Sequence, residues 1–364
     1  MTGNTLFWRR LRPVLAVDAP MLAILGLLMA AGLTTLYSAS ADFPGRFELQ
    51  LRHVLMALAL MWGAANIPPR VLMRHAVTLY SIGVGLLLAV FLFGLTKKGS
   101  TRWLNIGHEF QPSEVMKIAM PMMLAWFFHR VDAAKGWQVF LLAAALLAVP
   151  VGLIAKQPDF GTAMLVLAAG FYVIVLAGLS WRVLAALTVC GAAAVPLVWH
   201  LLHDFQRQRV LTFLDPGADP MGKGFQITQA MTAIGSGGMT GRGWMDGTQG
   251  RLGFIPERST DFIFSVFAEE FGLLGGIVLL VLYALLIVRG LQISANATTR
   301  FSRLLGGAIT MILFTYAFIN IGMVCGVVPV VGVPLPFFSY GGTALLTLGL
   351  GCGILMSIRK ESLI

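Results

Sequence analysis

Of the 364 residues, 57% are hydrophobic and only 12% are charged, and the formal net charge is +10. Soluble domains carry about 25% charged residues, so this composition excludes a soluble globular protein and indicates a chain that crosses a membrane several times. In a soluble chain the positive excess would suggest a nucleic-acid partner. In a membrane protein it must first be assigned to one side of the bilayer.

Ten apolar stretches are long enough to cross a bilayer core of about 30 Å, which takes about 20 helical residues. They are too long and too uniformly apolar for barrel strands, which alternate over about ten residues. The predicted fold class is therefore an all-α polytopic membrane protein with about ten transmembrane helices. The expected spans are residues 19–39, 51–67, 75–95, 113–128, 138–154, 160–178, 182–200, 262–288, 304–327 and 338–357.

The first span has features of a secretory signal peptide, since arginines precede it and the sequence ASA (39–41) resembles a cleavage site. However, residues 19–39 exceed the about 7–15 apolar residues of a signal-peptide core. An uncleaved first helix is the favoured interpretation.

Lys and Arg near the span ends predict that both termini are cytoplasmic. In this orientation the cytoplasmic segments hold thirteen basic and three acidic residues, which is the whole net charge. The remaining thirteen basic and thirteen acidic residues balance each other. The net charge therefore indicates orientation and implies no nucleic-acid partner.

Residues 1–364 are expected to form a single integral membrane domain, with one large extracytoplasmic loop at 201–261 before the eighth span. A loop of that length is usually functional or disordered, and its retained apolar residues favour an ordered one. Ile227, Met231 and Ile234 recur at helical spacing and predict a short helix at the membrane surface. The surrounding glycines allow the backbone to approach a ligand closely.

Several kinds of site are not expected. No phosphate-binding loop of the form G-x-x-x-x-G-K-[ST] occurs, and the three cysteines and six histidines lack the spacing of a metal site.

Ionisable residues at the outer span ends are functional candidates, because a charge at a span centre costs about 2.5–3.5 kcal/mol. Glu114 and Lys117 share one helix face, where they either neutralise each other or line a polar cavity. Asp159 has helix capping as its alternative role. Arg52 has extension towards the lipid headgroups as its alternative.

The sequence PERSTD (256–261) is the densest charged cluster and immediately precedes the eighth span. Asp261 is placed either to cap that helix or to act as a general base, since a nearby apolar environment raises a carboxyl pKa. Spacing alone leaves both roles open. Prolines 329, 334 and 336 interrupt helical structure before Ser339. Non-helical backbone within a membrane is tolerated beside a water-filled cavity.

Five motifs, in order over nearly the whole chain, resemble the signatures of the SEDS family (shape, elongation, division and sporulation). They are QPSEVMK (111–117), QPDFGT (157–162), AIGSGG (233–238), GFIPERSTDFIF (253–264) and PFFSYGGT (336–343). The Arg258 motif, the Pro336 motif and the short N-terminus are more similar to the members that serve cell elongation than to those that serve division.

The resemblance implies a peptidoglycan glycosyltransferase of the bacterial cytoplasmic (inner) membrane, with its active site facing the periplasm. Such an enzyme polymerises lipid II, an undecaprenyl-pyrophosphate-linked disaccharide peptide, into β-1,4-linked glycan strands for elongation and rod shape. The implied partners are a class B penicillin-binding protein and other elongation-complex proteins. The family's essential aspartate falls on Asp261, and its cavity positions fall on Trp103, Glu114, Lys117 and Asp159. The family commonly has His where this chain has Ser259, which favours Asp261 as the proton acceptor.

This chemistry needs a base for the attacking sugar hydroxyl and cations for the leaving pyrophosphate. A single carboxylate as base predicts inversion, since retention needs a second carboxylate as nucleophile. A divalent cation, Mg²⁺ or Mn²⁺, at the pyrophosphate is compatible with this scheme, but no metal-ligand set is legible. Asp261 is the expected catalytic residue, and the expected substrate-binding residues are Arg52, Arg102, Trp103, Glu114, Lys117, Asp159, Arg207, Arg242, Glu257, Arg258 and Ser339.

Two other functions fit part of the pattern. A lipid II flippase or transporter would also use broken helices and intramembrane charges, although the motif residues concentrate on one side and no inverted repeat is apparent. A scaffold of the elongation complex would need no residue for chemistry.

Overall fold

The computed structural model describes residues 17–97, 100–105, 109–131, 136–201, 204–215, 217, 222–248, 255 and 257–363. Six of its helices are long and apolar enough to cross a membrane, namely α2 (Ala19–Ala39), α4 (Pro69–Phe93), α6 (Trp137–Lys156), α12 (Ile263–Ala295), α13 (Arg300–Val324) and α14 (Gly342–Glu361). The others that coincide with expected spans are α3 (Arg46–Ala65), α5 (Pro112–Arg130), α7 (Phe160–Leu176) and α8 (Trp181–Leu201). The prediction of a helical, multi-span chain is confirmed.

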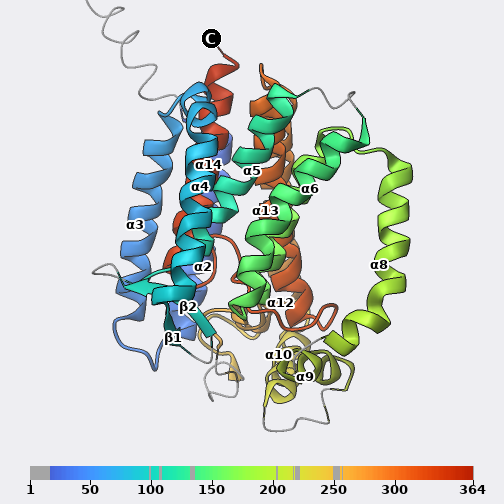
Figure 1. Ribbon diagram of the computed structural model, residues 1–364. Helices are drawn as coiled ribbons and strands as arrows, with labels where there is room; N and C mark the ends of the chain where they lie inside the picture. The colour runs from blue at the N-terminus through green and yellow to red at the C-terminus, as the bar shows by residue number, and fades with distance from the viewer. Residues whose placement is uncertain are drawn as a thin grey trace, which may run out of the picture.

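The helices run alternately up and down the bundle (Figure 1). Asp18, which caps α2, pairs with Arg289 near the end of α12 at 2.5 Å and lies 3.9 Å from Arg359 of α14. Arg70 at the start of α4 pairs with Glu361 at 3.5 Å. The first and last described helices therefore meet at one end of the bundle.

The opposite end of the bundle holds a small sheet, and we call it the sheet end (Figure 1). It also holds α9 (Asp204–Leu214), α10 (Lys223–Gly237) and residues 325–341. Strands β1 (Leu95–Lys97), β2 (Ser100–Asn105) and β3 (Glu109–Phe110) pair antiparallel in that order between α4 and α5. No strands were expected in this connection, and the three short ones are an addition to a fold that is otherwise helical. Three-stranded pairing satisfies backbone groups of a polar connection.

The described part of the loop 201–261 contains the helices α9 and α10. The helix predicted around Ile227, Met231 and Ile234 is confirmed as α10, with Ile227 buried. It packs on α12, and the following backbone passes the kink of α12 at Gly272, whose φ is +65°. A β-carbon at Gly272 would lie 2.3 Å from the Gly241 nitrogen, so glycine is required there.

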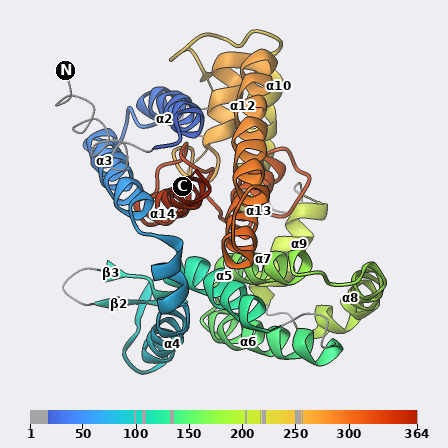
Figure 2. The same ribbon diagram turned by 90° about the horizontal axis from the view of Figure 1, so that it is seen from above.

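The core is centred on α13, which contacts α5, α7, α12 and α14. Helix α14 also packs along α3, and a β-carbon on Gly353 would lie 2.3 Å from the Met61 carbonyl oxygen. Helix α8 stands apart at the periphery (Figures 1 and 2). An apolar cavity of about 1020 Å³ separates it from α6 and α7.

Candidate active site

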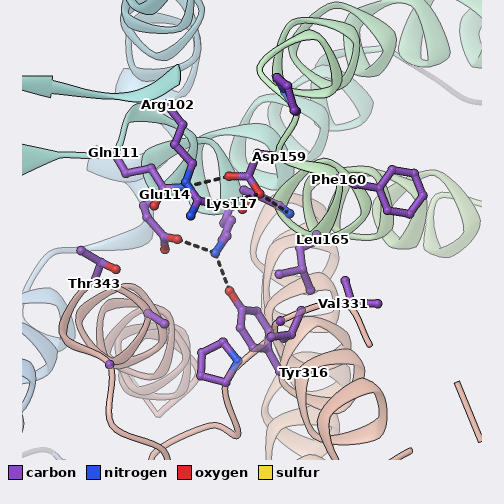
Figure 3. A pocket seen from close by; sticks show the side chains of 18 residues that line it. Arg102, Gln111, Glu114, Lys117, Asp159, Phe160, Leu165, Tyr316, Val331 and Thr343 are labelled. Atoms are coloured by element: carbon purple, nitrogen blue, oxygen red, sulfur yellow. Dashed lines mark hydrogen bonds and ion pairs between the residues drawn. The ribbon is translucent and has the colours of Figure 1, made fainter. Parts of the chain in front are cut away.

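A polar pocket of about 250 Å³ opens at the sheet end between α5, α7, α13 and the start of α14. Side chains from β2, α5 and α13 point into it (Figure 3). Four of the predicted site residues line it, namely Arg102, Glu114, Lys117 and Asp159. The lining also includes Thr343 of α14, so residues more than two hundred positions apart in the sequence form one cavity.

Lys117 lies at the base of this pocket and is 4% exposed. Its Nζ donates to Glu114 Oε1 at 2.7 Å and to the Tyr316 hydroxyl at 2.6 Å (Figure 3). Thr347 donates to the other oxygen of Glu114 at 3.1 Å. Burying an ammonium is costly unless it is paired and hydrogen-bonded. Both alternatives for the pair hold, because Glu114 and Lys117 neutralise each other and also line the cavity.

Asp159 combines capping with a place in the pocket. Its Oδ1 accepts a 3.3 Å hydrogen bond from the Thr162 backbone, so it caps α7. Its Oδ2 accepts a 2.8 Å hydrogen bond from the Gln111 amide. Arg102 Nη1 lies 3.7 Å from Asp159 Oδ1 (Figure 3). The carboxylate therefore joins β2, the start of α5 and the start of α7.

Asp261 lies beside the pocket rather than among its described lining residues. Helix α12 starts at Ile263, and its N-cap residue is Phe262, without a side-chain cap. Asp261 is thus not the N-cap residue. A β-carbon added to Gly332 would lie 3.4 Å from Asp261 Oδ2, and Gly332 lines the pocket. The half-buried carboxylate and the pocket therefore meet at this glycine.

Ser339 joins the two motifs that border the site. Its Oγ donates to the Thr260 carbonyl at 2.7 Å and accepts from the Leu335 N–H at 2.8 Å. The Tyr340 N–H donates to the Ser259 carbonyl at 2.9 Å. The Ser339 side chain holds the segment 257–261 against 335–341, so it shapes the site through the backbone.

Arg258 and Glu257 are not among the described residues that line the pocket. Arg258 is buried, donates to the Ala39 carbonyl at 2.8 Å and pairs with Asp42. Glu257 is exposed and accepts from the Thr260 hydroxyl at 2.9 Å. Their predicted roles in substrate binding stay predictions.

The remaining predicted residues also lie outside the pocket lining. Arg52 is exposed on α3, and Trp103 is half-buried on β2. Arg207 donates to the Trp199 and His200 carbonyls, at 2.9 and 2.8 Å. Arg242 is exposed and donates to Thr248 at 3.0 Å. Their roles in substrate binding stay predictions.

Three further polar residues belong to this region. Tyr316 and Asn320 lie four apart on α13, and both are fully buried. Arg46 donates to Ser259 Oγ at 2.5 Å. Polar side chains four apart in an apolar span are a signal that could have identified the first two.

Among the described residues, no group of three or more His, Cys, Asp or Glu side chains is arranged to hold a metal ion. Glu114 and Asp159, the acids of the pocket, already face Lys117 and Arg102. A divalent cation carried by a pyrophosphate stays a prediction.

Known proteins resemble this chain over most of its length. The peptidoglycan glycosyltransferase MrdB of Escherichia coli K12 is 48% identical over 357 residues, which are 98% of this chain and 95% of that protein. MrdB of Helicobacter pylori J99 is 37% identical over 79% of this chain and 76% of its own. A probable peptidoglycan glycosyltransferase FtsW of Methylococcus capsulatus is 36% identical over 86% of this chain and 80% of its own.

Solved structures share the fold. A chain from a peptidoglycan synthase complex that coordinates polymerization and crosslinking matches with a TM-score of 0.84 and 34% identity, covering 96% of this chain and 99% of that one. The rod shape determining protein RodA of Thermus thermophilus matches with a TM-score of 0.73 and 29% identity, covering 95% and 98%. The model of the FtsW/RodA/SpoVE family of cell cycle proteins matches residues 15–363. The chain therefore belongs to the FtsW/RodA/SpoVE (SEDS) family, as its five motifs indicated.

Proposed function

We propose that this chain is a peptidoglycan glycosyltransferase that polymerises lipid II into β-1,4-linked glycan strands for elongation of the cell. The relative named MrdB from Escherichia coli K12 carries that enzyme name and is 48% identical over 98% of this chain. The observation that carries the chemistry is the pocket itself. Two cations, Lys117 and Arg102, line it together with Gly332, and the Asp261 carboxylate lies against Gly332.

Asp261 is proposed as the general base. It takes the proton of the acceptor sugar's hydroxyl while that oxygen attacks the anomeric carbon of the donor sugar. The bond to the pyrophosphate breaks, and the lipid pyrophosphate leaves. Attack opposite the leaving group inverts the anomeric centre, because no second carboxylate is assigned as nucleophile.

Lys117 and Arg102 are proposed to stabilise the negative charge that develops on the leaving pyrophosphate. Glu114 and Tyr316 hold the Lys117 ammonium in place, and Asp159 holds Arg102. Cations fixed in advance lose little free energy to reorganisation during the reaction.

We further propose ten spans with both termini in the cytoplasm, the pocket open to the periplasm and residues 201–261 extracytoplasmic. In support, Arg70, Arg289 and Arg359 cluster at the bundle end opposite the pocket. Lys and Arg favour cytoplasmic segments. A class B penicillin-binding protein is the proposed partner, supported by the likeness to a chain of a peptidoglycan synthase complex.

The test uses the full chain purified with its penicillin-binding partner and supplied with lipid II in detergent. Gel analysis should show glycan polymer from the wild type and none from Asp261→Asn. Asp215→Asn is the matched control, because Asp215 is exposed at the end of α9. Equal polymer from Asp261→Asn would overturn the base assignment. Transbilayer movement of lipid II without polymer would favour a flippase, and rod shape supported by Asp261→Ala would favour a scaffold.

A further inference from the structure

One buried amide fixes the position of Asp261 relative to the pocket. Asn320 of α13 is fully buried, and its Nδ2 donates to the Asp261 carbonyl at 2.9 Å and to the Val333 carbonyl at 2.7 Å. The two acceptors belong to different segments, the turn before α12 and the irregular stretch after α13. A single side chain therefore ties both segments to one helix.

These two segments are the ones that meet at the proposed base. Val333 and Gly332 line the pocket, and Gly332 lies against the Asp261 carboxylate. Because Phe262, the N-cap residue of α12, makes no side-chain cap hydrogen bond, the turn carrying Asp261 lacks that common anchor. The Asn320 amide supplies a direct link between the backbone of Asp261 and the pocket wall.

The same amide is an expensive choice for packing alone. Among the described residues, Asn320 Oδ1 is buried without a hydrogen-bond partner. A buried polar atom that is left without a hydrogen bond destabilises the folded state. An apolar residue would avoid this cost but would lose both hydrogen bonds. The unsatisfied oxygen therefore speaks against a role of Asn320 in stability alone and for a role in setting the geometry of the two segments.

We propose that Asn320 is a positioning residue for glycosyl transfer. It holds the Asp261 carboxylate at a fixed distance from the pocket wall, so that the acceptor hydroxyl and the base meet in the reactive arrangement. The inference rests on the proposed function, with Asp261 as the base.

Tyr283 supplies a matched comparison. Its hydroxyl, also buried, donates to the Pro336 carbonyl at 2.7 Å, in the same irregular segment. Replacing Tyr283 by Phe removes one buried hydrogen bond to that segment without touching Asp261. A residue that acts only on stability should behave as Tyr283 does.

The experiment measures initial polymerisation rates against lipid II concentration for the full chain with its partner, together with thermal unfolding. In Asn320→Leu, kcat should fall about tenfold to a hundredfold with little change in KM, because a misplacement of about 1 Å costs about 100-fold. Tyr283→Phe should lose stability while keeping kcat. Asn320→Gln keeps the donors one methylene further out and should retain an intermediate kcat.

Unchanged kcat in Asn320→Leu would overturn the proposal, as would equal losses of kcat in Asn320→Leu and Tyr283→Phe. If neither Asn320 variant folds, the residue is a core residue only and the proposal is wrong. If Asp261→Asn is inactive while Asn320→Leu is fully active, the positioning role of Asn320 is rejected and the proposed base is not. Full activity of Asp261→Asn would reject the proposed base on which it rests.

Discussion

Lys117 of α5 and Tyr316 of α13 are joined by a 2.6 Å hydrogen bond from the ammonium to the phenol oxygen, at the base of the polar pocket. The two residues are 199 positions apart. The phenol is the second partner of an ammonium whose first partner, Glu114, lies on its own helix. Tyr316 thus helps to set where the positive charge lies in the cavity.

Tyr316→Phe should weaken both stability and polymerisation. A hydrogen bond to a charged group contributes about 1.5–3 kcal/mol. We therefore expect the free energy of unfolding to fall by that amount and the unfolding temperature to fall with it. Polymerisation should fall less than in Lys117→Met, which removes the cation itself and should cost about 100-fold in rate. The measurements are thermal unfolding in detergent and initial rates with lipid II.

Tyr172→Phe is the control for this change. Its hydroxyl lies 2.6 Å from Thr315 Oγ1 and joins α7 to α13 outside the described pocket lining. It should lose stability while keeping its rate. Equal rates for Tyr316→Phe and the wild type would show that Tyr316 does not position Lys117.

Two substitutions at Asp159 should separate its two roles. Asn is a good N-cap residue, whereas Ala at an N-cap costs about 0.5–2 kcal/mol. Asp159→Asn should therefore keep the start of α7 but lose the charge facing Arg102, so that polymerisation falls with little loss of stability. Asp159→Ala should lose both. If Asp159→Asn polymerises like the wild type, the residue acts through capping alone.

The sequence predicts the helices of this chain well, for a clear physical reason. Each apolar run long enough to cross a bilayer is helical, since a spanning segment must satisfy its own backbone hydrogen bonds. Prolines and capping residues mark several ends, as Pro69 does for α4 and Asp159 for α7. The strands β1 to β3 were missed because the segment 95–110 is short and polar.

Which face of each helix packs inwards was not predictable. A span is apolar all round, because lipid and protein interior are alike in polarity. In the most apolar 18-residue stretch of α13, 72% is buried, whereas in that of α12 only 28% is, although both stretches are strongly apolar. Partners distant in sequence, such as Tyr316 for Lys117, therefore could not be paired from the sequence.

The charged residues were predicted as candidates for the site, but the sequence did not show which of them line the pocket. Arg102 and Arg258 were both expected to bind substrate, yet Arg102 lines the pocket and Arg258 pairs with Asp42. Glu269 and Glu270 of α12 accept hydrogen bonds from the backbone N–H groups of Thr248 and Met245, respectively. Only the tertiary fold decides which charges meet.

The ion pair at the end opposite the pocket should make stability depend on pH. Burial tends to raise the pKa of Asp18, but hydrogen bonds from Arg289 and from the Met21 N–H outweigh it, so the pKa lies below 3.8. A lowered folded-state pKa contributes stability that is complete above the unfolded value and is lost as pH falls through the folded one.

Asp18→Asn keeps a capping side chain but loses this charge pair. At pH 7 we expect the free energy of unfolding of this variant to be about 1–3 kcal/mol lower than that of the wild type. Its unfolding temperature should be lower as well. The difference should shrink as the pH falls below the ordinary value of 3.8 and through the lowered pKa at which folded Asp18 takes up its proton. A difference that stays constant from pH 7 to pH 3 would contradict the pairing.

Gly332→Ala tests whether the contact between Asp261 and the pocket wall must stay open. Gly332 has φ +78°, and its β-carbon would lie 3.4 Å from Asp261 Oδ2. Gly178 also has a positive φ, +109°, with nothing within 4 Å of its β-carbon. Each Ala variant should lose about 1–2 kcal/mol, the cost of a left-handed backbone for an L-residue. Only Gly332→Ala should also lower kcat, because its methyl group crowds the carboxylate. Equal rates for the two variants at saturating lipid II would show that the acceptor hydroxyl does not reach Asp261 across this glycine.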